Sequence, residues 1–374
     1  MSKRPPTKDK GRRVNFAVDH MDPMGQGVSR DGKLVTFIAG TLPGEAGQAV
    51  VYKKSKGVQF ATLSSLENSA DNRCEPQCPH FSQCPGCHYL HTDYASELSY
   101  KRSALVRHLS QLSIAEDQIE LVPAPSRLSY RNRVQLHYRH KYIGMLDPVN
   151  NRVVEIPHCK IIDEKLQPAF DQLYEDKSWT EANTGHGHCE LYLKDGAVGE
   201  TWNDDYAHGG FSQVNNAMNG ELQARVDKQL TELKATRVLD LFSGKGNLSD
   251  GFASAGGQRV LVDSFWDVAA SEPPQNFVKL DLFDDDALKL FFRRHGKEAF
   301  DTLLVDPPRR GFAQLDTWVK KAKPKYLVYV SCNPASLARD LRGLSSKFEI
   351  VTLTLLDLFP ATYHFETLIV LRFR

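Results

Sequence analysis

The sequence lacks a long apolar segment and a strong excess of charge. No run of its 374 residues approaches the ~18 consecutive apolar residues of a membrane-spanning helix. Residues 1–6 carry two charges, Lys3 and Arg4, with no apolar segment behind them, so no secretory signal is expected. The 47 basic residues nearly balance the 46 acidic ones, so overall charge does not indicate a nucleic-acid partner. These absences predict a cytoplasmic protein that contacts no membrane.

The composition is otherwise that of a folded protein. Hydrophobic residues make up 41% and charged residues 25% of the chain, which excludes wholesale disorder and collagen. At about 150 residues per domain, the length predicts two or three domains. Charge is uneven only at the start, where residues 1–13 carry six basic side chains and one acidic one. This tail is expected to be disordered and either to contact phosphate or to act only as a solubilising terminus.

Cysteine is scarce but concentrated. The chain has seven cysteines, and four of them fall within fourteen residues. Without a secretion signal, such a cluster favours metal or redox chemistry over disulfides. The spacing Cys78-x5-Cys84-x2-Cys87 leaves one ligand position for a more distant residue. Cys159 is favoured for it, because Cys74 lies very close to Cys78 in the chain.

Two kinds of metal centre fit this spacing. Zinc takes tetrahedral sulfur ligands, and His80, His88 and His91 also allow a mixed zinc site. An iron–sulfur cluster takes four cysteines. Residues 71–91 are rich in proline and glycine and show no periodicity, so we expect the cysteines to supply the order of this segment.

The first half of the chain is predicted to form mostly β-strands. Residues 14–66 contain short apolar runs separated by glycine turns, which predicts a small OB-like β-barrel. Apolar residues recur at helical spacing over 94–112, with Asp93 as the N-cap. Residues 130–202 alternate in short runs and predict a second β-rich region.

The pattern changes near residue 216 to alternating helices and strands. A helical segment over 216–233 leads into an apolar strand at 237–242, which ends in a glycine turn. Further strands, mostly separated by helical patterns, are predicted at 259–263, 301–305, 325–331, 349–355 and 366–373. Such alternation predicts an α/β fold with a doubly wound, mainly parallel sheet.

Residues suited to binding or catalysis follow several of these strands. A Gly-x-Gly turn lets a ligand approach the backbone closely, and Asp263 can accept both hydroxyls of a ribose. Asp306 and Cys332 each come at the end of a strand, and Glu366 opens the last one. Ligands bind at the carboxyl edge of open α/β sheets, so these side chains are predicted to form one site.

Together these motifs resemble the RNA uracil-C5 methyltransferase family, the iron–sulfur-containing enzymes that make 5-methyluridine. The resemblance covers nearly the whole chain. The matching segments are Gly25-Gln26-Gly27-Val28, Leu42-Pro43-Gly44-Glu45, Cys78-Pro79-His80-Phe81, Cys84-Pro85-Gly86-Cys87, Tyr130-Arg131-Asn132-Arg133, Phe211-Ser212-Gln213-Val214-Asn215, Asp306-Pro307-Pro308-Arg309, Ser331-Cys332-Asn333 and His364-Phe365-Glu366.

The resemblance implies three domains. Residues 12–70 would form a TRAM-like RNA-binding β-barrel. Residues 71–91 and 123–209 would form a β-rich iron–sulfur central domain. Residues 92–122 and 210–374 would form a Rossmann-like, doubly wound domain that uses S-adenosylmethionine.

The resemblance also implies roles for single residues. Cys332 would be the nucleophile and Glu366 the base. The residues implied to hold a [4Fe–4S] cluster are Cys78, Cys84, Cys87 and Cys159. The residues implied to line the S-adenosylmethionine site are Gln213, Phe242, Asn247, Asp263, Asp281 and Asp306.

The implied reaction is methylation of a uridine C5 in structured RNA by a monomer. The expected substrate is 23S ribosomal RNA, and transfer RNA is the alternative. One stretch departs from the family: Asp263 stands where glutamate is usual, and residues 264–279 contain Pro273-Pro274 and leave room for about two helical turns. Both differences predict weaker S-adenosylmethionine binding. They are the only support for another alternative, a non-catalytic RNA-binding or assembly protein.

Overall fold

A computed structural model describes residues 11–204, 212–266, 272–296 and 298–374. The chain forms two compact units, and each is discontinuous in sequence. The first comprises Met1–Ala104, Ser126–Asp204 and Phe359–Tyr363; the second comprises Leu105–Pro125, Asp205–Leu358 and His364–Arg374. Most of the basic tail expected at residues 1–13 lies outside the described residues. The expected three-domain division stays a prediction.

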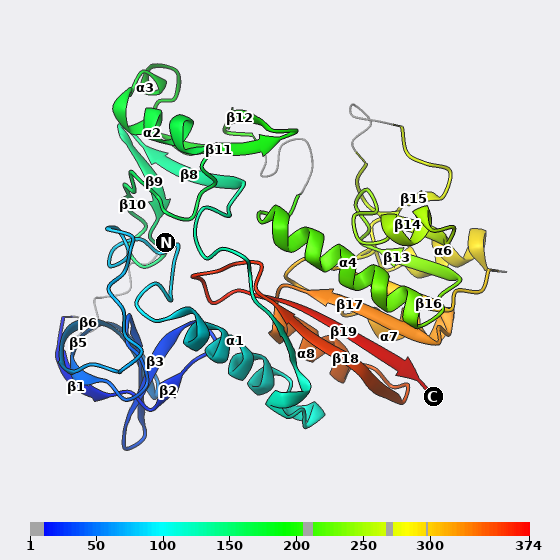
Figure 1. Cartoon of the computed structure of the whole chain (residues 1–374), viewed down its shortest axis with the longest axis horizontal. Coiled ribbons are helices and arrows are strands. Elements are labelled where there is room, and N and C mark those ends of the chain that lie inside the picture. The colour runs from blue at the N-terminus through cyan, green and yellow to red at the C-terminus, as the bar shows by residue number, and fades with distance from the viewer. Residues whose placement is uncertain (1–10, 205–211, 267–271, 297) are drawn as a thin grey trace. The chain divides into compact units, whose positions relative to one another are not determined.

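A curled six-stranded sheet opens the first unit (Figure 1). Its strands are β1 (Arg13–Ala17), β2 (His20–Met21), β3 (Gln26–Asp31), β4 (Leu34–Ala39), β5 (Ala46–Ser55) and β6 (Val58–Asn68), in the order β1-β5-β6-β4-β3-β2. Neighbouring strands are antiparallel except β4 and β6. Within the described residues no ladder joins β1 to β2. The expected small barrel is therefore an open half-barrel.

A second, five-stranded antiparallel sheet lies in the β-rich region expected at 130–202. Its strands are β8 (Arg133–Arg139), β9 (Tyr142–Leu146), β10 (Val153–Val154), β11 (His186–Lys194) and β12 (Ala197–Trp202), in the order β10-β9-β8-β11-β12. Two short helices, α2 (Gln167–Glu175) and α3 (Trp179–Ala182), interrupt the strands. Phe170 and Trp179 from these helices share a core with Leu136 and Leu191 of the sheet.

Helix α1 (Tyr94–His108) begins where the sequence predicts. Asp93 accepts hydrogen bonds from the Ser96 amide at 2.7 Å and the Ser96 hydroxyl at 2.9 Å, as an N-cap does. The chain then continues into a 3₁₀ turn, Ser110–Leu112, so the helical region expected over 94–112 is present with a break near residue 109.

The second unit is built on an eight-stranded sheet. Its strands are β7 (Glu120–Val122), β13 (Arg237–Leu241), β14 (Gln258–Asp263), β15 (Phe277–Lys279), β16 (Thr302–Val305), β17 (Tyr326–Ser331), β18 (Phe348–Leu356) and β19 (Glu366–Phe373), in the order β15-β14-β13-β16-β17-β19-β18-β7. All neighbours are parallel except β19, which runs antiparallel to β17 and β18.

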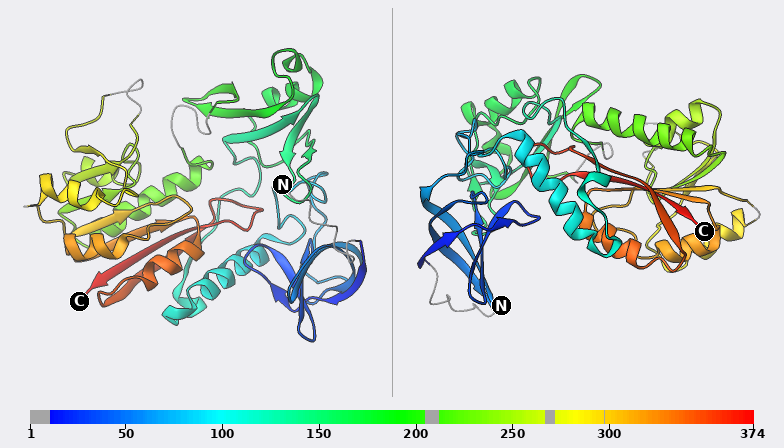
Figure 2. Two further views of the ribbon diagram at one scale, coloured as in Figure 1. Left: turned by 180° about the vertical axis from the view of Figure 1, so that it is seen from behind. Right: turned by 60° about the horizontal axis from the view of Figure 1, so that its bottom comes forward.

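Helices cover both faces of this sheet. The helices that follow or precede its strands are α4 (Asn216–Glu232), α5 (Asp250–Ser254), α6 (Ala287–His295), α7 (Leu315–Ala322) and α8 (Pro334–Arg342). The right-hand view of Figure 2 shows α4 on one face and α8 on the other. The predicted α/β, mainly parallel, doubly wound sheet is confirmed. Among the described residues, no helix is both long and apolar enough to cross a membrane.

Candidate functional site

The carboxyl edge of the eight-stranded sheet brings Cys332 and Glu366 together. Strand β17 ends at Ser331, so Cys332 comes directly after it. Strand β19 runs the other way, and its Thr367 pairs with Ser331. The start of an antiparallel strand lies at the edge where its parallel neighbour ends. Glu366, the first residue of β19, is therefore next to Cys332 at this edge.

The Cys332 thiol is half-buried, and its surroundings hold the proton on sulfur. Burial raises its pKa to about 12, and the neighbouring Glu366 carboxylate adds to the rise. The Arg309 guanidinium acts in the opposite direction and favours the thiolate. In the free protein at neutral pH the thiol is therefore protonated, and a reaction partner must favour its ionisation.

Two carboxyl groups accompany this thiol. Glu366 is 2% exposed, and burial raises its pKa well above the usual range, with Asp306 as the next cause. Burial also raises the pKa of Asp306 to about 7, and Asp240 adds to that rise. The Glu366 Oε1 atom is buried and makes no hydrogen bond within the described part of the chain. A buried carboxyl group with a raised pKa is suited to proton transfer near neutral pH.

The loops that carry these residues are tied to α8. The Asn333 side chain caps α8 and donates a hydrogen bond from Nδ2 to the Arg309 carbonyl at 2.8 Å. Asp340 accepts from the Phe312 amide at 2.6 Å and from the Tyr329 hydroxyl at 2.7 Å. The sequence interpretation did not single out Asn333 or Asp340 for these contacts. An asparagine before Pro334 is a detectable N-cap signal, whereas Asp340 carries none.

The glycine turn after β13 adopts a conformation that needs glycine. Gly244 and Gly246 both have left-handed backbones, with φ of 53° and 92°. Asp263, at the end of β14, accepts hydrogen bonds from the Gly244 amide at 2.9 Å and the Phe265 amide at 3.1 Å. The Asp263 carboxylate, which is expected to bind a ribose, therefore also bonds the loop after β13 and the loop after β14 at the carboxyl edge of the sheet.

The other expected cofactor residues are distributed around the same edge. Those that lie at or just after the carboxyl ends of β13, β14, β15 and β16 are Phe242, Asn247, Asp263, Asp281 and Asp306. Gln213 is half-buried and precedes α4. The Asn247 side chain bonds Asn219 and Gln223 of α4. The Phe242 ring lies 5.2 Å from that of Phe283. The Asp281 carboxylate accepts from the Phe283 amide at 2.9 Å.

A separate group of residues lies in the first unit, where four cysteines line one cavity. They are Cys78, Cys84, Cys87 and Cys159. The remaining lining is largely apolar and includes Met145 and Ile156, with Arg131 as a charged member. Cys74 is exposed and is not among the described residues that line this cavity. The fold thus brings the distant Cys159, rather than the nearby Cys74, to the other three.

The cavity disfavours free thiolates. Burial raises the pKa of Cys84 to about 11 and also raises the pKa values of Cys87 and Cys159. His80 lines the cavity, but its Nε2 is hydrogen-bonded to the Pro157 carbonyl. Over the described ranges, no three histidine, cysteine or acidic side chains converge closely enough to hold a single metal ion.

Known proteins resemble this chain over almost its full length. A family model described as tRNA (Uracil-5-)-methyltransferase matches residues 290–374. A 23S rRNA (uracil(1939)-C(5))-methyltransferase RlmD from Shewanella frigidimarina is 29% identical over 97% of this chain and 96% of that protein. The protein of the same name from Pectobacterium carotovorum is 28% identical over 96% of this chain and 93% of its own length.

A solved structure shares the fold. The tRNA (uracil-54, C5)-methyltransferase of Pyrococcus abyssi, in complex with S-adenosyl-L-homocysteine, aligns with a TM-score of 0.68 over 96% of this chain and all of that one. At 20% identity this likeness concerns the fold alone. The full-length relatives and the family model over residues 290–374 make this chain similar to S-adenosylmethionine-dependent RNA uracil-C5 methyltransferases.

Proposed function

We propose that this protein methylates C5 of one uridine in 23S ribosomal RNA, with Cys332 as the nucleophile and Glu366 as the base. The observation that carries the proposal is the position of these two side chains beside each other at one sheet edge. The full-length likeness to enzymes named for a 23S uridine supports ribosomal RNA over transfer RNA as the substrate.

The chemistry explains why a thiol and a carboxylate are needed together. Uracil C5 is a poor nucleophile. Addition of the Cys332 sulfur to C6 forms an S–C6 bond and moves the electron pair of the C5–C6 double bond into an enolate. C5 then bonds the methyl group of S-adenosylmethionine, which leaves as S-adenosylhomocysteine. Glu366 takes the C5 proton, the double bond re-forms, and the S–C6 bond breaks to release the thiolate.

The surroundings of the two residues suit these steps. The raised pKa of Glu366 makes its carboxylate a stronger base than an exposed glutamate. Arg309 is the charge near Cys332 that lowers the thiol pKa, so it would assist ionisation when the uridine binds. S-adenosylmethionine would be held by the residues at the ends of β13 to β16, with the Gly244 turn allowing close approach.

The half-barrel offers a surface suited to RNA. Phe37 of β4 and Phe60 of β6 stack with ring centroids 5.3 Å apart, and Tyr52 lies 6.4 Å from Phe60. The ammonium group of Lys53 lies 5.4 Å from the Phe60 ring. Half-buried aromatic rings beside lysines are the combination with which proteins stack unpaired bases and contact phosphate. These contacts support a TRAM-like, RNA-binding role for this sheet.

The four-cysteine cavity fits a [4Fe–4S] cluster better than a zinc ion. Zinc at about 2.3 Å from each sulfur would bring the sulfurs within about 4 Å of one another. No three ligands among the described residues meet that way. In a cluster each cysteine binds a different iron, so the four sulfurs surround a larger volume. When bound, the cluster would join the segment that carries Cys84 to the one that carries Cys159.

The cluster assignment predicts a coloured protein. Purified without oxygen, the protein should be brown and absorb near ~400 nm. Cys84→Ser should bleach it and lower its melting temperature, because the bound cluster would otherwise join the segment of Cys84 to that of Cys159. Cys74→Ser is the matched control and should keep the colour, since Cys74 is exposed outside the cavity. Stoichiometric zinc without iron would overturn the assignment.

The substrate is tested with RNA from cells that lack the protein. Labelled S-adenosylmethionine should transfer its methyl group to 23S ribosomal RNA, and digestion should yield labelled 5-methyluridine. RNA from cells that contain the protein is the control and should take up little label, because the position is already methylated. Label in transfer RNA alone would overturn the ribosomal substrate. Absence of transfer to either RNA would overturn the enzymatic proposal.

A further inference from the structure

A short segment of the second half of the chain packs within the first unit. Residues Phe359–Tyr363, here called the strap, lie between β18 and β19 in sequence but belong to the first unit. Ala361 has a left-handed backbone with φ of 66°, an uncommon state for a residue with a side chain. A backbone held in such a state indicates that surrounding contacts fix the strap in one conformation.

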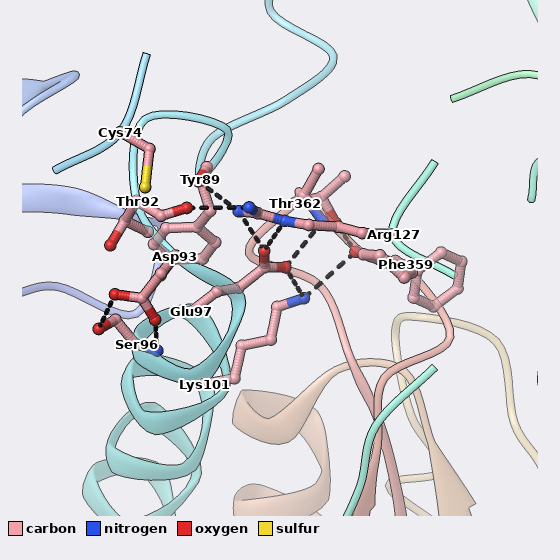
Figure 3. Close-up of polar contacts among 12 residues, drawn as sticks. Cys74, Tyr89, Thr92, Asp93, Ser96, Glu97, Lys101, Arg127, Phe359 and Thr362 are labelled. Atoms are coloured by element: carbon pink, nitrogen blue, oxygen red, sulfur yellow. Dashed lines mark hydrogen bonds and ion pairs between the residues drawn. The ribbon is translucent and has the colours of Figure 1, made fainter. Parts of the chain in front are cut away.

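Glu97 and Lys101 bond the strap and Arg127 pairs with Glu97; we call these three side chains the clamp. Glu97 accepts from Lys101 at 2.7 Å on one carboxylate oxygen and from Arg127 at 2.7 Å on the other. Figure 3 shows this carboxylate between the two cations. Glu97 and Lys101 are 0% and 1% exposed. Charges so deeply buried are costly to keep unless each is paired.

The clamp bonds the strap backbone directly. The Ala361 amide donates to Glu97 at 2.7 Å, and Lys101 donates to the Phe359 carbonyl at 3.2 Å. The Tyr130 hydroxyl donates to the Pro360 carbonyl at 3.1 Å. Three consecutive strap residues are thus each fixed by a side chain of the first unit.

The loop that carries Cys78, Cys84 and Cys87, here called the cysteine loop, also bonds the strap at Ala361. The amides of His88 and Tyr89, the two residues after Cys87, both donate to the Ala361 carbonyl, at 2.7 and 3.0 Å. Arg127 in turn donates to the carbonyls of Tyr89 at 2.5 Å and Thr92 at 2.9 Å. The clamp, the cysteine loop and the strap therefore form one hydrogen-bonded assembly.

The strap continues directly into the strand that carries Glu366. Only His364 and Phe365 separate Tyr363 from Glu366, which is the first residue of β19. The Glu366 Oε1 atom makes no hydrogen bond within the described residues, so no hydrogen bond there fixes the orientation of that oxygen. Its position depends on the backbone at the start of β19, which pairs with β18 from Glu366 and with β17 from Thr367 onward and continues into the strap on the other side.

We propose that Glu97, Lys101 and Arg127 are positioning residues for proton removal by Glu366, acting through the strap. The inference rests on the proposed role of Glu366 as the base. A loosened strap leaves Cys332 in place directly after β17 and displaces only the start of β19. Addition to C6 and methyl transfer then continue, while removal of the C5 proton slows.

Lys101→Met tests the proposal with little disturbance of charge, because Glu97 keeps Arg127 as its counter-ion. We expect kcat to fall on the order of 10- to 100-fold, since a displacement of about 1 Å at a catalytic group has that effect. KM for RNA should change by less than about twofold, because Lys101 and its partner Glu97 are buried away from the surface that RNA can reach. Covalent RNA–protein adduct should accumulate on a denaturing gel, and the absorbance near ~400 nm per chain should be unchanged.

Three further variants keep the test decisive. Tyr130→Phe removes only the hydroxyl that bonds Pro360, so it should give the same adduct accumulation with a several-fold smaller loss of kcat even if Lys101→Met does not fold. Lys101→Arg keeps a cationic donor and should restore part of kcat. Lys228→Met removes an exposed partner of Glu232 in α4 and should behave as the unaltered protein.

The outcomes separate this inference from the function on which it rests. If the unaltered protein transfers no methyl group, the proposed function has failed. If it is active and both Lys101→Met and Tyr130→Phe match Lys228→Met in kcat and adduct level, the positioning role is wrong. Loss of kcat without adduct accumulation in Tyr130→Phe would also overturn it, because a general loss of structure would produce that result.

Discussion

Cys332→Ala should abolish methyl transfer and every covalent adduct with RNA. Without the sulfur, no atom adds to C6, and C5 never gains the electron density with which it attacks the methyl group. The expected loss of kcat is on the order of 10⁴-fold or more, as for removal of other catalytic nucleophiles. The measurement is transfer of labelled methyl to unmodified RNA, together with a denaturing gel for the adduct.

Cys189→Ala is the matched control for this loss. Cys189 is fully buried in β11 of the first unit, so its replacement tests whether removal of a core thiol alone affects activity. Its kcat should stay near that of the unaltered protein. An adduct that still forms in Cys332→Ala would show that another residue attacks C6.

The raised pKa of Cys332 predicts how the reactivity of this thiol depends on pH. Because burial and Glu366 raise the pKa of the thiol to about 12, few molecules of free protein carry the thiolate at pH 7. Alkylation of Cys332 by iodoacetamide, followed by peptide mass mapping, should therefore still accelerate as the pH rises from 7 to about 10. A plateau near pH 7 would contradict this expectation.

Periodicity predicted the second unit well, for a physical reason. Central parallel strands are buried on both faces and appear in the sequence as short apolar runs, as Leu303-Leu304-Val305 and Leu327-Val328-Tyr329-Val330 do. Periodicity did not predict that β19 lies between β17 and β18. Strand order depends on contacts between segments far apart in sequence, and those contacts leave no local pattern.

The candidate site could be predicted in part. Cys332 follows a strand and Glu366 opens one, so their place at the sheet edge was accessible from the sequence. The strap was not, because the contacts of Glu97 and Lys101 with residues 359–361 join segments more than 250 positions apart. The half-barrel was predicted as a small OB-like barrel, since strand lengths and turns do not reveal whether the first and last strands pair.

Glu366→Gln should reduce turnover nearly as much as Cys332→Ala does. On a denaturing gel it should show the covalent RNA–protein adduct that Cys332→Ala lacks. Glutamine has the shape of glutamate and cannot take up the C5 proton. Attack on C6 and methyl transfer precede proton removal, so both should still occur. The methylated RNA should then stay bound to Cys332, because the S–C6 bond breaks only after the C5 proton has left. A persistent RNA–protein band is expected, provided S-adenosylmethionine is present.

The order of the steps makes this test stringent. General unfolding would remove the band, so its presence also reports an intact protein. The double variant with Cys332→Ala should lose the band, which places the bond on that sulfur. Glu349→Gln, at an exposed glutamate of β18 that pairs with Arg372, is the matched control and should turn over normally without a lasting band. If Glu366→Gln forms no adduct while its fold and cofactor binding are retained, Glu366 acts before or during the attack of Cys332 on C6, and proton removal from C5 must be assigned to another group.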